Sequence, residues 1–380
     1  MLNHLYIDNY KCYINFEIKF DQINLLMGDN GVGKTSAFDA LRALKNFVLE
    51  GARVSDLFPG HTLTRWEKRS KQTFELGFIG NGGIYKYRLV VEHELPSLAK
   101  NRVYEEKLFL DGNILFSFEL GRVHLYRDDY SAGPEFPFDW NGSALATVGE
   151  SSDNHKLIWF RDRLRKLHIL QINPFKKYMS AVSTEEDQTP QSDLSNFASW
   201  YRHLWQQDPS ALLDFFRSLT PVISEFRSLK FASDGEKTRI LTVEQERFFN
   251  AEGNETLKSE KKDFAFDELS DGQRQLIALY TILHFGLNED TTYCLDEPDN
   301  FVSLREIQPW LMEMDDRCQS HQAQTLFISH HPEIINYLAS ANGLLLTRQH
   351  NGPVRVQPFA DGNNSGLSAA ELVARGWENE

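Results

Sequence analysis

The feature that most constrains this chain is a glycine-rich octapeptide between an apolar segment and a helical pattern. Gly28-Asp29-Asn30-Gly31-Val32-Gly33-Lys34-Thr35 fits the pattern GxxxxGK[ST] without a gap. It follows an apolar run, Ile23–Met27, and precedes a segment, Thr35–Glu50, whose apolar residues share one helical face. Glycines let successive N–H groups point at a phosphate, and the start of a helix adds partial positive charge. A buried strand, a tight turn and a helix are therefore predicted in direct succession.

The residues of this loop have separate predicted roles. Lys34 can reach the β- and γ-phosphates of a nucleotide and is also a candidate catalytic residue. The Thr35 hydroxyl can ligate Mg²⁺. The predicted phosphate-binding residues are Asn30, Gly31, Val32, Gly33, Lys34, Thr35 and Ser36. By contrast, Gly80-Asn81-Gly82-Gly83 is interpreted as a hairpin turn.

Composition limits the class of protein. The 380 residues allow one large domain or two ordinary ones, and 41% hydrophobic with 25% charged residues is typical of a soluble globular protein. The net charge is −14, so any contact with DNA needs a local basic patch or a partner. Cys12, Cys294 and Cys318 stand far apart, which favours a reducing compartment. With neither a signal peptide nor an apolar run of about 18 residues, the protein is expected to be cytoplasmic, without a membrane partner.

The N-terminal part is predicted to be rich in strands. Alternating residues indicate strands at Leu5–Ile7 and Ile14–Phe20, and residues 73–120 have the pattern of an antiparallel meander. Residues 127–155 are rich in Asp, Gly, Pro, Ser and Asn, which indicates a long loop. Within the meander, Glu105-Glu106-Lys107 is interpreted as a solvated hairpin face.

The remaining segments change from mixed to regularly alternating. A helix is expected at Lys156–Lys166 and a strand at Leu167–Ile172, followed by a polar, mobile stretch at 176–192. Helices are expected within 193–228 and strands within 229–247, before a charged, flexible stretch at Asn250–Lys262. The last segments are expected to be a helix at Gly272–Phe285, a strand at Thr292–Leu295, a helix at Leu304–Gln319 and a strand at Thr325–Ser329. This alternation favours a βαβ core with a mainly parallel sheet.

A second group of motifs lies in the C-terminal third. Leu269-Ser270-Asp271-Gly272-Gln273 opens an apolar-faced helix, so Ser270, Gly272 and Gln273 stand where a helix start can meet an anion. The alternative is that Ser270 is only a helix cap.

An apolar strand in the same region ends in two acids. Asp296 can hold Mg²⁺ through water, and Glu297 can polarise a water molecule as a general base. The alternative is a strand that leaves the core into a charged turn.

In their order, these motifs resemble the ABC-class ATPases of the SMC, RecF and OLD-like group. The resemblance covers roughly residues 1–50 and 260–340 and includes INLLMGDNGVGKTSAFDALRAL, LDEPDNFVSL and SHHPEII. Asp271 replaces one glycine of the LSGGQ signature, and the Leu-His-Pro usual after the acidic pair is absent. The resemblance implies an ATPase that uses ATP and Mg²⁺, with active sites completed between two head-to-tail copies, as a dimer or a higher oligomer.

The resemblance also assigns roles to four further places. The resemblance implies that His330, directly after Ser329, contacts the γ-phosphate; a metal site is less favoured there, because no carboxylate or Cys lies at helical ligand spacing. Asp299-Asn300 falls where the family has its D-loop. Gln171 is the candidate for a glutamine that senses Mg²⁺ and water, with a buried structural amide as the alternative, and Lys11 is expected to approach the nucleotide phosphates.

The expected fold is an α/β P-loop NTPase head of the ABC type, with a mixed or parallel sheet, an antiparallel β-meander lobe and a mainly helical insertion. Residues 1–175 are assigned to the N-terminal part of the head, 176–260 to an insertion with helices and strands, and 261–380 to the C-terminal part. The insertion is too short for an SMC arm.

Three functions remain open at this point. One is an ATPase that regulates an effector, such as a nuclease or Toprim-like protein, in bacterial anti-phage defence. Another is a RecF- or SMC-like DNA-repair or DNA-clamp ATPase that acts on DNA directly. The third is a scaffold that binds ATP and barely hydrolyses it, against which the intact Glu297 speaks. A GTPase is not expected, because no NKxD motif occurs.

Overall fold

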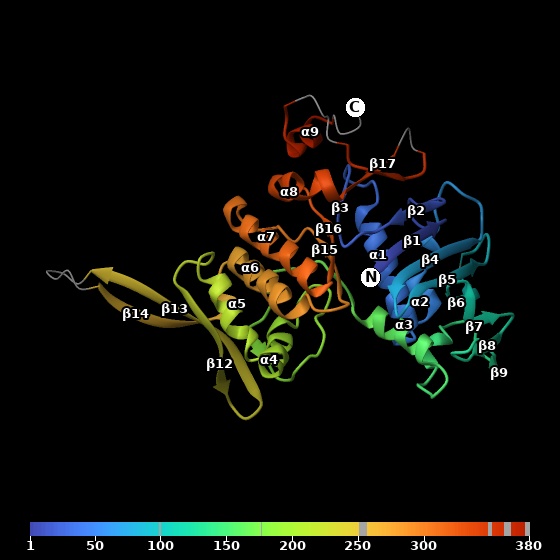
Figure 1. The fold of residues 1–380 in the computed structure, drawn as a ribbon, viewed down its shortest axis with the longest axis horizontal. Coiled ribbons are helices and arrows are strands. Elements are labelled where there is room, and N and C mark those ends of the chain that lie inside the picture. Colours follow the sequence, from blue (N-terminus) through green and yellow to red (C-terminus); the bar gives the residue numbers. More distant parts are fainter. Residues whose placement is uncertain (99, 176, 251–256, 349–351, 361–365, 377–380) are drawn as a thin grey trace.

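The structure, a computed structural model, describes residues 1–98, 100–175, 177–250, 257–348, 352–360 and 366–376. A β-lobe, a central sheet with helices on both faces and a projecting hairpin follow one another across the molecule (Figure 1). In the described residues, no helix combines the length and the apolar character needed to span a membrane.

The predicted meander is an antiparallel sheet that also includes the N-terminal strands. Its order is β2-β1-β4-β5-β6-β7-β8-β9. The strands are β1 (Leu2–Asp8), β2 (Phe16–Lys19), β4 (Lys71–Gly80), β5 (Gly83–His93), β6 (Asn101–Leu110), β7 (Asn113–Glu119), β8 (Arg122–Tyr126) and β9 (Ala132–Pro137). The expectation of a long loop over 127–155 was therefore wrong in part, since β9 and a 3-10 turn, η2 (Leu145–Thr147), lie inside it. The turn-rich local sequence does not predict β9, because that strand depends on its pairing with β8.

The central sheet has the parallel core that the alternation predicted. Its order is β10-β15-β16-β3-β17-β18, in which only the β17–β18 pair is antiparallel among the described pairings. The strands are β3 (Ile23–Met27), β10 (Leu167–Leu170), β15 (Thr292–Asp296), β16 (Gln324–Ile328), β17 (Gly343–Thr347) and β18 (Arg355–Pro358). β3, β15 and β16 are buried along their whole length, as strands covered on both faces should be.

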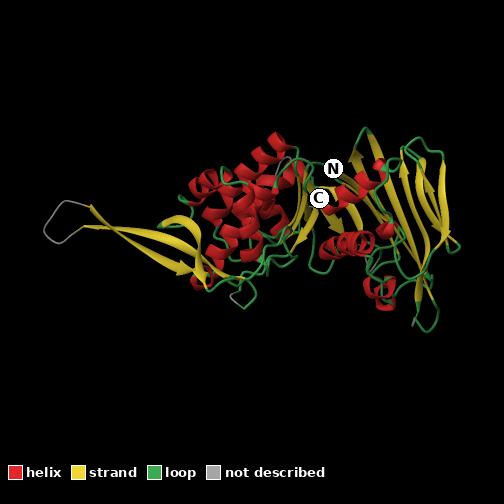
Figure 2. Ribbon diagram, turned by 90° about the horizontal axis from the view of Figure 1, so that it is seen from below, coloured by secondary structure: helices red, strands yellow, loops and turns green. Residues whose placement is uncertain are grey.

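Helices cover the two faces of this sheet in two separate cores (Figure 2). One face carries α1 (Lys34–Glu50) and α3 (His155–Arg165), and the other carries α6 (Asp271–Thr281), α7 (Leu304–His321) and α8 (Pro332–Asn342). Successive strand residues alternate between the cores: Leu26 packs with α1, and Leu25 packs with α6. The sheet thus separates α1 from α6.

Short elements complete the head. They are α2 (Val54–Leu57), η1 (Gly60–Thr62), η3 (Phe266–Glu268), η4 (Ile282–Gly286), which is a π-turn that continues α6, and α9 (Ala369–Arg375), which packs against α8.

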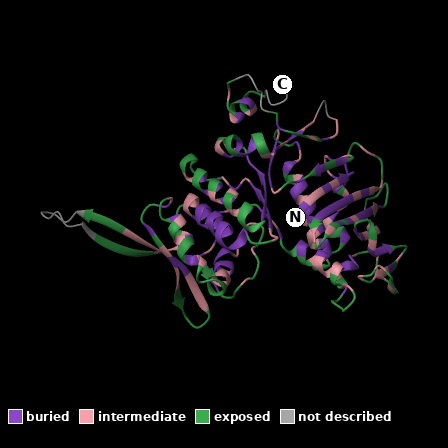
Figure 3. Ribbon diagram, viewed as in Figure 1, coloured by how far each residue is buried: buried purple, intermediate pink, exposed green. Residues whose placement is uncertain are grey.

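The insertion has the helices expected within 193–228 and the strands expected within 229–247, so it is less helical than the fold prediction stated. It contains α4 (Phe197–Gln207) and α5 (Ala211–Leu219), but also β11 (Val182–Ser183), β12 (Phe226–Asp234), β13 (Thr238–Asn250) and β14 (Leu257–Ala265). The stretch Asn250–Lys262, expected to be flexible, belongs to β13 and β14 where it is described, and 251–256 lie outside the described residues. Cross-strand pairing, rather than local propensity, makes these charged residues a hairpin, which is largely exposed (Figure 3).

Glu106 corrects another expectation, because its side chain is buried in the β-lobe instead of solvated. The Tyr87 hydroxyl, 2.9 Å away, and the Ser143 hydroxyl donate hydrogen bonds to Glu106 Oε1. Burial raises the pKa of Glu106 from 4.5 to about 7, although these hydrogen bonds lower it.

This raised pKa predicts a measurable pH dependence of stability. Between the pKa of 4.5 in the unfolded chain and about 7 in the folded protein, the carboxyl group is protonated only in the folded protein. The contribution of Glu106 to the free energy of unfolding is therefore complete below the unfolded-state pKa and is lost as pH rises through about 7. Between about pH 5.5 and about pH 8, the free energy of unfolding of the wild type should fall by about 2 kcal/mol relative to Glu106→Gln. Urea titrations of both proteins check this, and equal pH slopes would contradict it.

Candidate nucleotide site

The carboxyl ends of four parallel strands bring the candidate residues to one edge of the central sheet. The register pairs Leu170 with Leu295, Leu295 with Phe327, and Phe327 with Leu25. Gln171, Asp296, Ser329 and the phosphate loop therefore follow strands that end in the same layer. This is the edge at which open α/β sheets bind ligands.

The phosphate loop is a backbone cradle that side chains would block. Gly28, Gly31 and Gly33 have φ angles of 134°, 79° and 125°, which glycine adopts without a steric penalty. A Cβ at Gly28 would collide with the carbonyl oxygen of Leu346, and one at Gly33 would lie 2.6 Å from Cys12 Sγ. The loop is thus closely packed from behind, while Asn30 and Gly31 face solvent.

The Lys34 side chain folds back onto the backbone of the phosphate loop. Its ammonium donates hydrogen bonds to the carbonyl oxygens of Gly28 at 2.6 Å and Asp29 at 3.1 Å. Burial lowers the pKa of Lys34, while the carboxylates of Glu297, Asp29 and Asp296 oppose that shift. A triphosphate in the cradle would supply the stronger, charged acceptor for the same ammonium.

Thr35 and Asp296 form the pair of groups that suits a magnesium ion. The Thr35 hydroxyl hydrogen-bonds the Asp296 carboxylate, which is buried at the end of β15. Burial raises the pKa of Asp296, and the negative charges of Glu297 and Asp39 raise it further. Because oxygen ligands and unbalanced negative charge both favour a hard divalent cation, these residues fit Mg²⁺.

Glu297 is held in a strained conformation by the turn after β15. Its φ of 49° is uncommon for a residue other than glycine, and its N–H donates to the carbonyl oxygen of Ile328 at 2.8 Å. The Asn300 side chain donates to Glu297 Oε2 at 3.0 Å. Backbone strain maintained by specific contacts is common where a side chain must point in a set direction.

The two adjacent histidines have different environments. His331 Nδ1 accepts a hydrogen bond from the N–H of Glu333 at 3.2 Å, so His331 caps α8. His330 is exposed beside the phosphate loop. Partial burial of the His330 imidazole lowers its pKa, Lys34 lowers it further, and the carboxylates of Glu297, Asp299 and Asp29 oppose these shifts. The geometry therefore favours His330 over His331 for contact with a phosphate.

Ser270 is a helix cap in this state, as the alternative interpretation proposed. Ser270 Oγ accepts from the N–H of Gln273 at 3.3 Å, and Gln273 Oε1 accepts from the N–H of Ser270 at 3.1 Å. Gly272 is pressed against the turn after β15, since a Cβ there would lie 2.5 Å from the carbonyl oxygen of Phe301. Ser270 opens α6, on the opposite face of the sheet from the helix that Lys34 opens.

Gln171 is exposed at the end of β10, so the alternative of a buried structural amide does not hold. Its backbone N–H donates to the carbonyl oxygen of Ser192 at 2.7 Å, and β10 lies beside the strand that ends in Asp296. This position leaves the Gln171 amide available at the same edge as the two acids.

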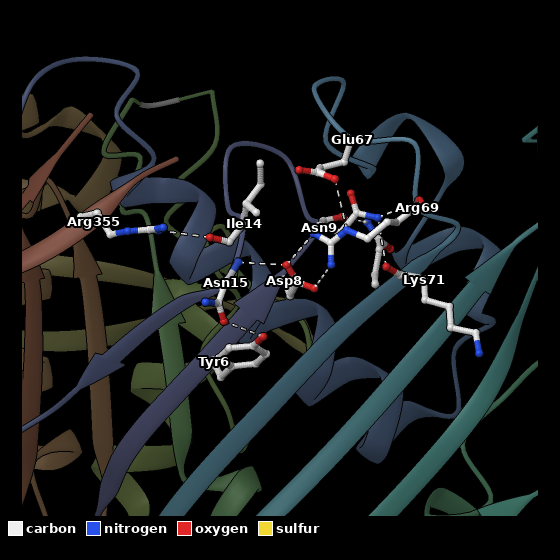
Figure 4. Close-up of polar contacts among 10 residues, drawn as sticks. Tyr6, Asp8, Asn9, Ile14, Asn15, Glu67, Arg69, Lys71 and Arg355 are labelled. Carbon is white, nitrogen blue, oxygen red and sulfur yellow. Dashed lines mark hydrogen bonds and ion pairs between the residues drawn. The ribbon is translucent and has the colours of Figure 1, made fainter. Parts of the chain in front are cut away.

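The turn between β1 and β2, which contains Lys11, is held by contacts of Asp8 and Asn15, of which Asp8 also binds Arg69 (Figure 4). Arg69 forms two hydrogen bonds with the Asp8 carboxylate, at 2.6 and 3.0 Å, and Asp8 in turn accepts from the N–H of Asn15. The Lys11 ammonium pairs with Asp39 at 2.7 Å, one helical turn after Thr35. The structure therefore places Lys11 next to the start of α1 and in an ion pair.

Sequence patterns alone did not identify several residues that support this site. Tyr13 donates a hydrogen bond to the Gly33 carbonyl oxygen at 2.8 Å, and Asp39 anchors both Lys11 and Arg42. Gln275, fully buried, donates to the Pro298 carbonyl oxygen at 2.7 Å and so joins α6 to the turn after Glu297. A polar Gln275 among apolar neighbours on the buried face of α6 was the available signal.

Comparisons with known proteins agree with this geometry. A family model described as "AAA ATPase domain" matches residues 1–106, and one described as "AAA domain, putative AbiEii toxin, Type IV TA system" matches residues 180–336. The first match includes the phosphate loop, and the second includes Ser270, Glu297 and His330. No protein of curated function matches the sequence.

Solved SMC heads share the fold. The head domain with an extended coiled coil bound to the C-terminal domain of ScpA, derived from Pyrococcus furiosus, aligns over 99% of this chain and 98% of its own, with a TM-score of 0.53 and 11% identity. A second SMC head, bound to the C-winged helix domain of ScpA, aligns over 94% and 97%, with a TM-score of 0.50 and 11% identity. These alignments confirm the predicted architecture of a P-loop ATPase head.

Proposed function

Because this chain is an AAA-type ATP hydrolase with an SMC-like head, we propose that it cleaves ATP between two copies packed head to tail. One observation carries the proposal: Lys34 and Ser270 begin helices that belong to different cores on opposite faces of the sheet. The two helix starts therefore lie on different sides of the sheet, an arrangement that favours their meeting one phosphate from two different copies. A second copy can bring its Ser270 and Gly272 over the γ-phosphate that the first copy holds.

Within this arrangement each named residue has one task. Lys34 exchanges its carbonyl partners for the β- and γ-phosphates. Glu297 accepts the proton of the attacking water, and His330, kept neutral, orders the γ-phosphate.

Thr35 and Asp296, with Gln171 beside them, are the residues that would hold Mg²⁺. A bound Mg²⁺ neutralises phosphate charge that develops during the reaction. Most of the rate enhancement then comes from positioning and fixed charge, so hydrolysis depends on both copies.

We further propose that the ATPase cycle regulates a partner effector protein in bacterial anti-phage defence. The description of the family model that matches 180–336 names a toxin–antitoxin system, which supports such a role. A projecting hairpin and a net charge of −14 also suit contacts with a protein better than wrapping by nucleic acid.

The outer face of the β-lobe disfavours the alternative of direct DNA binding there. Arg88 pairs with Glu75 and with Glu105 at 2.9 Å, and Lys86 pairs with Glu75 at 2.7 Å. Lys107 on the next strand pairs with Glu105 at 3.2 Å. Each of these cations is already neutralised by a neighbouring acid, so little positive potential remains for a phosphate backbone.

Two measurements on the full chain discriminate the candidates. If a partner protein is the target, the chain co-expressed with the products of adjacent genes co-purifies with one of them, and loss of Glu297 abolishes protection in a phage plaque assay. If DNA is the target, the isolated chain with ATP binds duplex DNA at physiological salt, as fluorescence anisotropy would show. ATP-dependent DNA binding by the isolated chain, without a co-purifying partner, would overturn the effector proposal.

A further inference from the structure

A cavity between α1 and β10 lies outside the nucleotide site. Its volume is about 470 Å³, and its walls come from α1, from the sheet strand β10 and from the segment 189–193. The α1 residues Arg42, Lys45 and Asn46 are three and four positions apart, so they share one face of the helix. The described lining includes none of the residues assigned above to ATP or Mg²⁺. The cavity is therefore a separate candidate site.

The Lys45 ammonium lines this cavity without a negatively charged partner. It donates hydrogen bonds to the carbonyl oxygens of Leu167 at 2.7 Å and Arg165 at 3.5 Å, and no carboxylate in the described residues lies within ion-pair distance of it. Burial lowers the pKa of Lys45 to about 8, although the charge of Glu50 opposes the shift. Lys34 is also held by carbonyl oxygens alone, beside the phosphate loop. A partly buried ammonium with only neutral acceptors is stabilised by an anion.

Two further nitrogen donors line the same cavity. The His168 ring stacks on Tyr293 with centroids 4.7 Å apart, and in the described part of the chain its ring nitrogens have no hydrogen-bond partner. Burial, and to a smaller extent Lys45, lowers the pKa of His168 to about 3, so the neutral ring keeps one N–H donor. Arg42 donates from Nη1 to Asp39 at 3.1 Å, while its Nη2 has no acceptor among the described residues. Donors from α1 and from β10 therefore meet at one cavity.

The acids that line the cavity limit the charge of a ligand. Glu50 is exposed at the end of α1, and Asp193 Oδ1 accepts a hydrogen bond from the N–H of Ser195 at 3.0 Å. Carboxylates accept hydrogen bonds from hydroxyl groups but repel a second phosphate. A ligand with one phosphate group and several hydroxyl groups suits both kinds of residue.

The wall opposite α1 is connected to Gln171. The carbonyl oxygen of Ser192 accepts from the N–H of Gln171 at 2.7 Å, and that of Asp193 accepts from the N–H of Asn173 at 3.1 Å. The segment 189–193 therefore reaches from the cavity to the residue proposed above to lie beside Mg²⁺. A ligand in contact with both walls would hold this segment against α1, the helix that Lys34 opens.

We propose that this cavity binds a phosphorylated sugar or similar polyol, and that the bound ligand fixes the position of Gln171. Lys45, His168 and Arg42 donate to the phosphate oxygens, which offer more acceptor positions than a carboxylate. The volume lies in the range of small-molecule sites and leaves room for a sugar beside the phosphate. Binding does not require two copies of the chain, and only the effect on Gln171 rests on the function proposed above.

Calorimetric titration with ribose 5-phosphate tests the site in the Lys34→Ala protein, whose phosphate loop lacks its ammonium. Lys45→Gln in this background should weaken binding at least tenfold. His168→Phe, which can keep the stacking on Tyr293, should also weaken binding. The matched control Lys19→Gln, which removes an exposed lysine of β2, should bind like the parent. Inorganic phosphate should bind more weakly than ribose 5-phosphate, and ribose alone should not bind measurably.

Hydrogen exchange tests the effect on Gln171 without any change in the cavity. Ribose 5-phosphate should slow amide exchange of the peptide 169–175 severalfold in Lys34→Ala, but not in Lys34→Ala with Lys45→Gln. Absence of binding by Lys34→Ala, or equal binding by the Lys45→Gln variant, would show that Lys45 only holds the edge of β10 and would overturn the site. Binding without slower exchange would contradict the action on Gln171. Neither measurement involves hydrolysis or pairing, so failure of the head-to-tail proposal would not affect them.

Discussion

Glu297→Gln is expected to reduce steady-state ATP hydrolysis by a factor on the order of 100 or more, while an ATP-bound dimer accumulates. Glutamine keeps the size of the side chain and can still contact Asn300, but it cannot accept a proton from water. The backbone of residue 297 stays fixed by its hydrogen bond to Ile328, so the turn should retain its shape. ATP binding needs Lys34 and the loop, which the substitution leaves intact. Phosphate release and size-exclusion chromatography with ATP measure the two effects.

The matched control is Glu289→Gln, since Glu289 is exposed in the turn before β15 and away from the carboxyl edge of the sheet. It should hydrolyse ATP at the wild-type rate. Normal turnover by Glu297→Gln would show that another group is the base. Slow turnover without a trapped dimer would leave the base assignment intact and contradict the head-to-tail pairing.

Two inactive variants should restore activity when combined. Lys34→Ala removes the ammonium that binds the phosphates, and Ser270→Arg places a bulky cation at the start of α6. Each variant alone should retain about 1% of the wild-type rate or less, because each site in its homodimer lacks one half. A mixed dimer contains one site with an intact loop and an intact signature. Random pairing makes about half of the dimers mixed, so an unseparated mixture should regain about a quarter of the wild-type rate, and purified mixed dimers, with one working site of two, about half.

Co-expression with two different tags, followed by tandem purification, enriches the mixed dimer for a phosphate-release assay. Nucleotide binding to isolated Ser270→Arg should match that of the wild type, which separates a catalytic defect from unfolding. Wild-type turnover by Ser270→Arg alone would mean that α6 takes no part in hydrolysis. A mixed dimer with no more activity than its components would mean that each chain builds its whole site.

The roles of residues that lie close together in the sequence could be predicted without the structure. The glycines at 28, 31 and 33 have positive φ angles, and a helix begins at Lys34, as the spacing of the motif required. Glu297 and His330 follow buried strands that hydrophobic runs had indicated. In such motifs the backbone connects the functional groups within a few residues, so the spacing itself carries the geometry.

Contacts between distant segments could not be assigned in this way. Glu106 was expected in solvent, because its hairpin pattern says nothing about Tyr87 and Ser143, which bury it. The stretch Asn250–Lys262, which includes much of β14, was expected to be flexible, because charged residues have low strand propensity. Pairs such as Lys230 with Glu244, at 3.1 Å, and Lys261 with Glu244, at 3.3 Å, join strands that only folding brings together.

By itself, the sequence determined that this protein has a phosphate loop, an acidic strand end and a signature helix, in the order of a P-loop ATPase head, since each motif depends on local backbone geometry. Only the tertiary structure decided that α1, which follows the phosphate loop, and α6, which Ser270 opens, lie on opposite faces of one sheet. It also decided that the backbone of Gly272 contacts the carbonyl group of Phe301 and that α9 lines a groove beside the phosphate loop. The physical reason is that such relations arise when a sheet buries both of its faces, and the strand order that achieves this is a property of the whole chain.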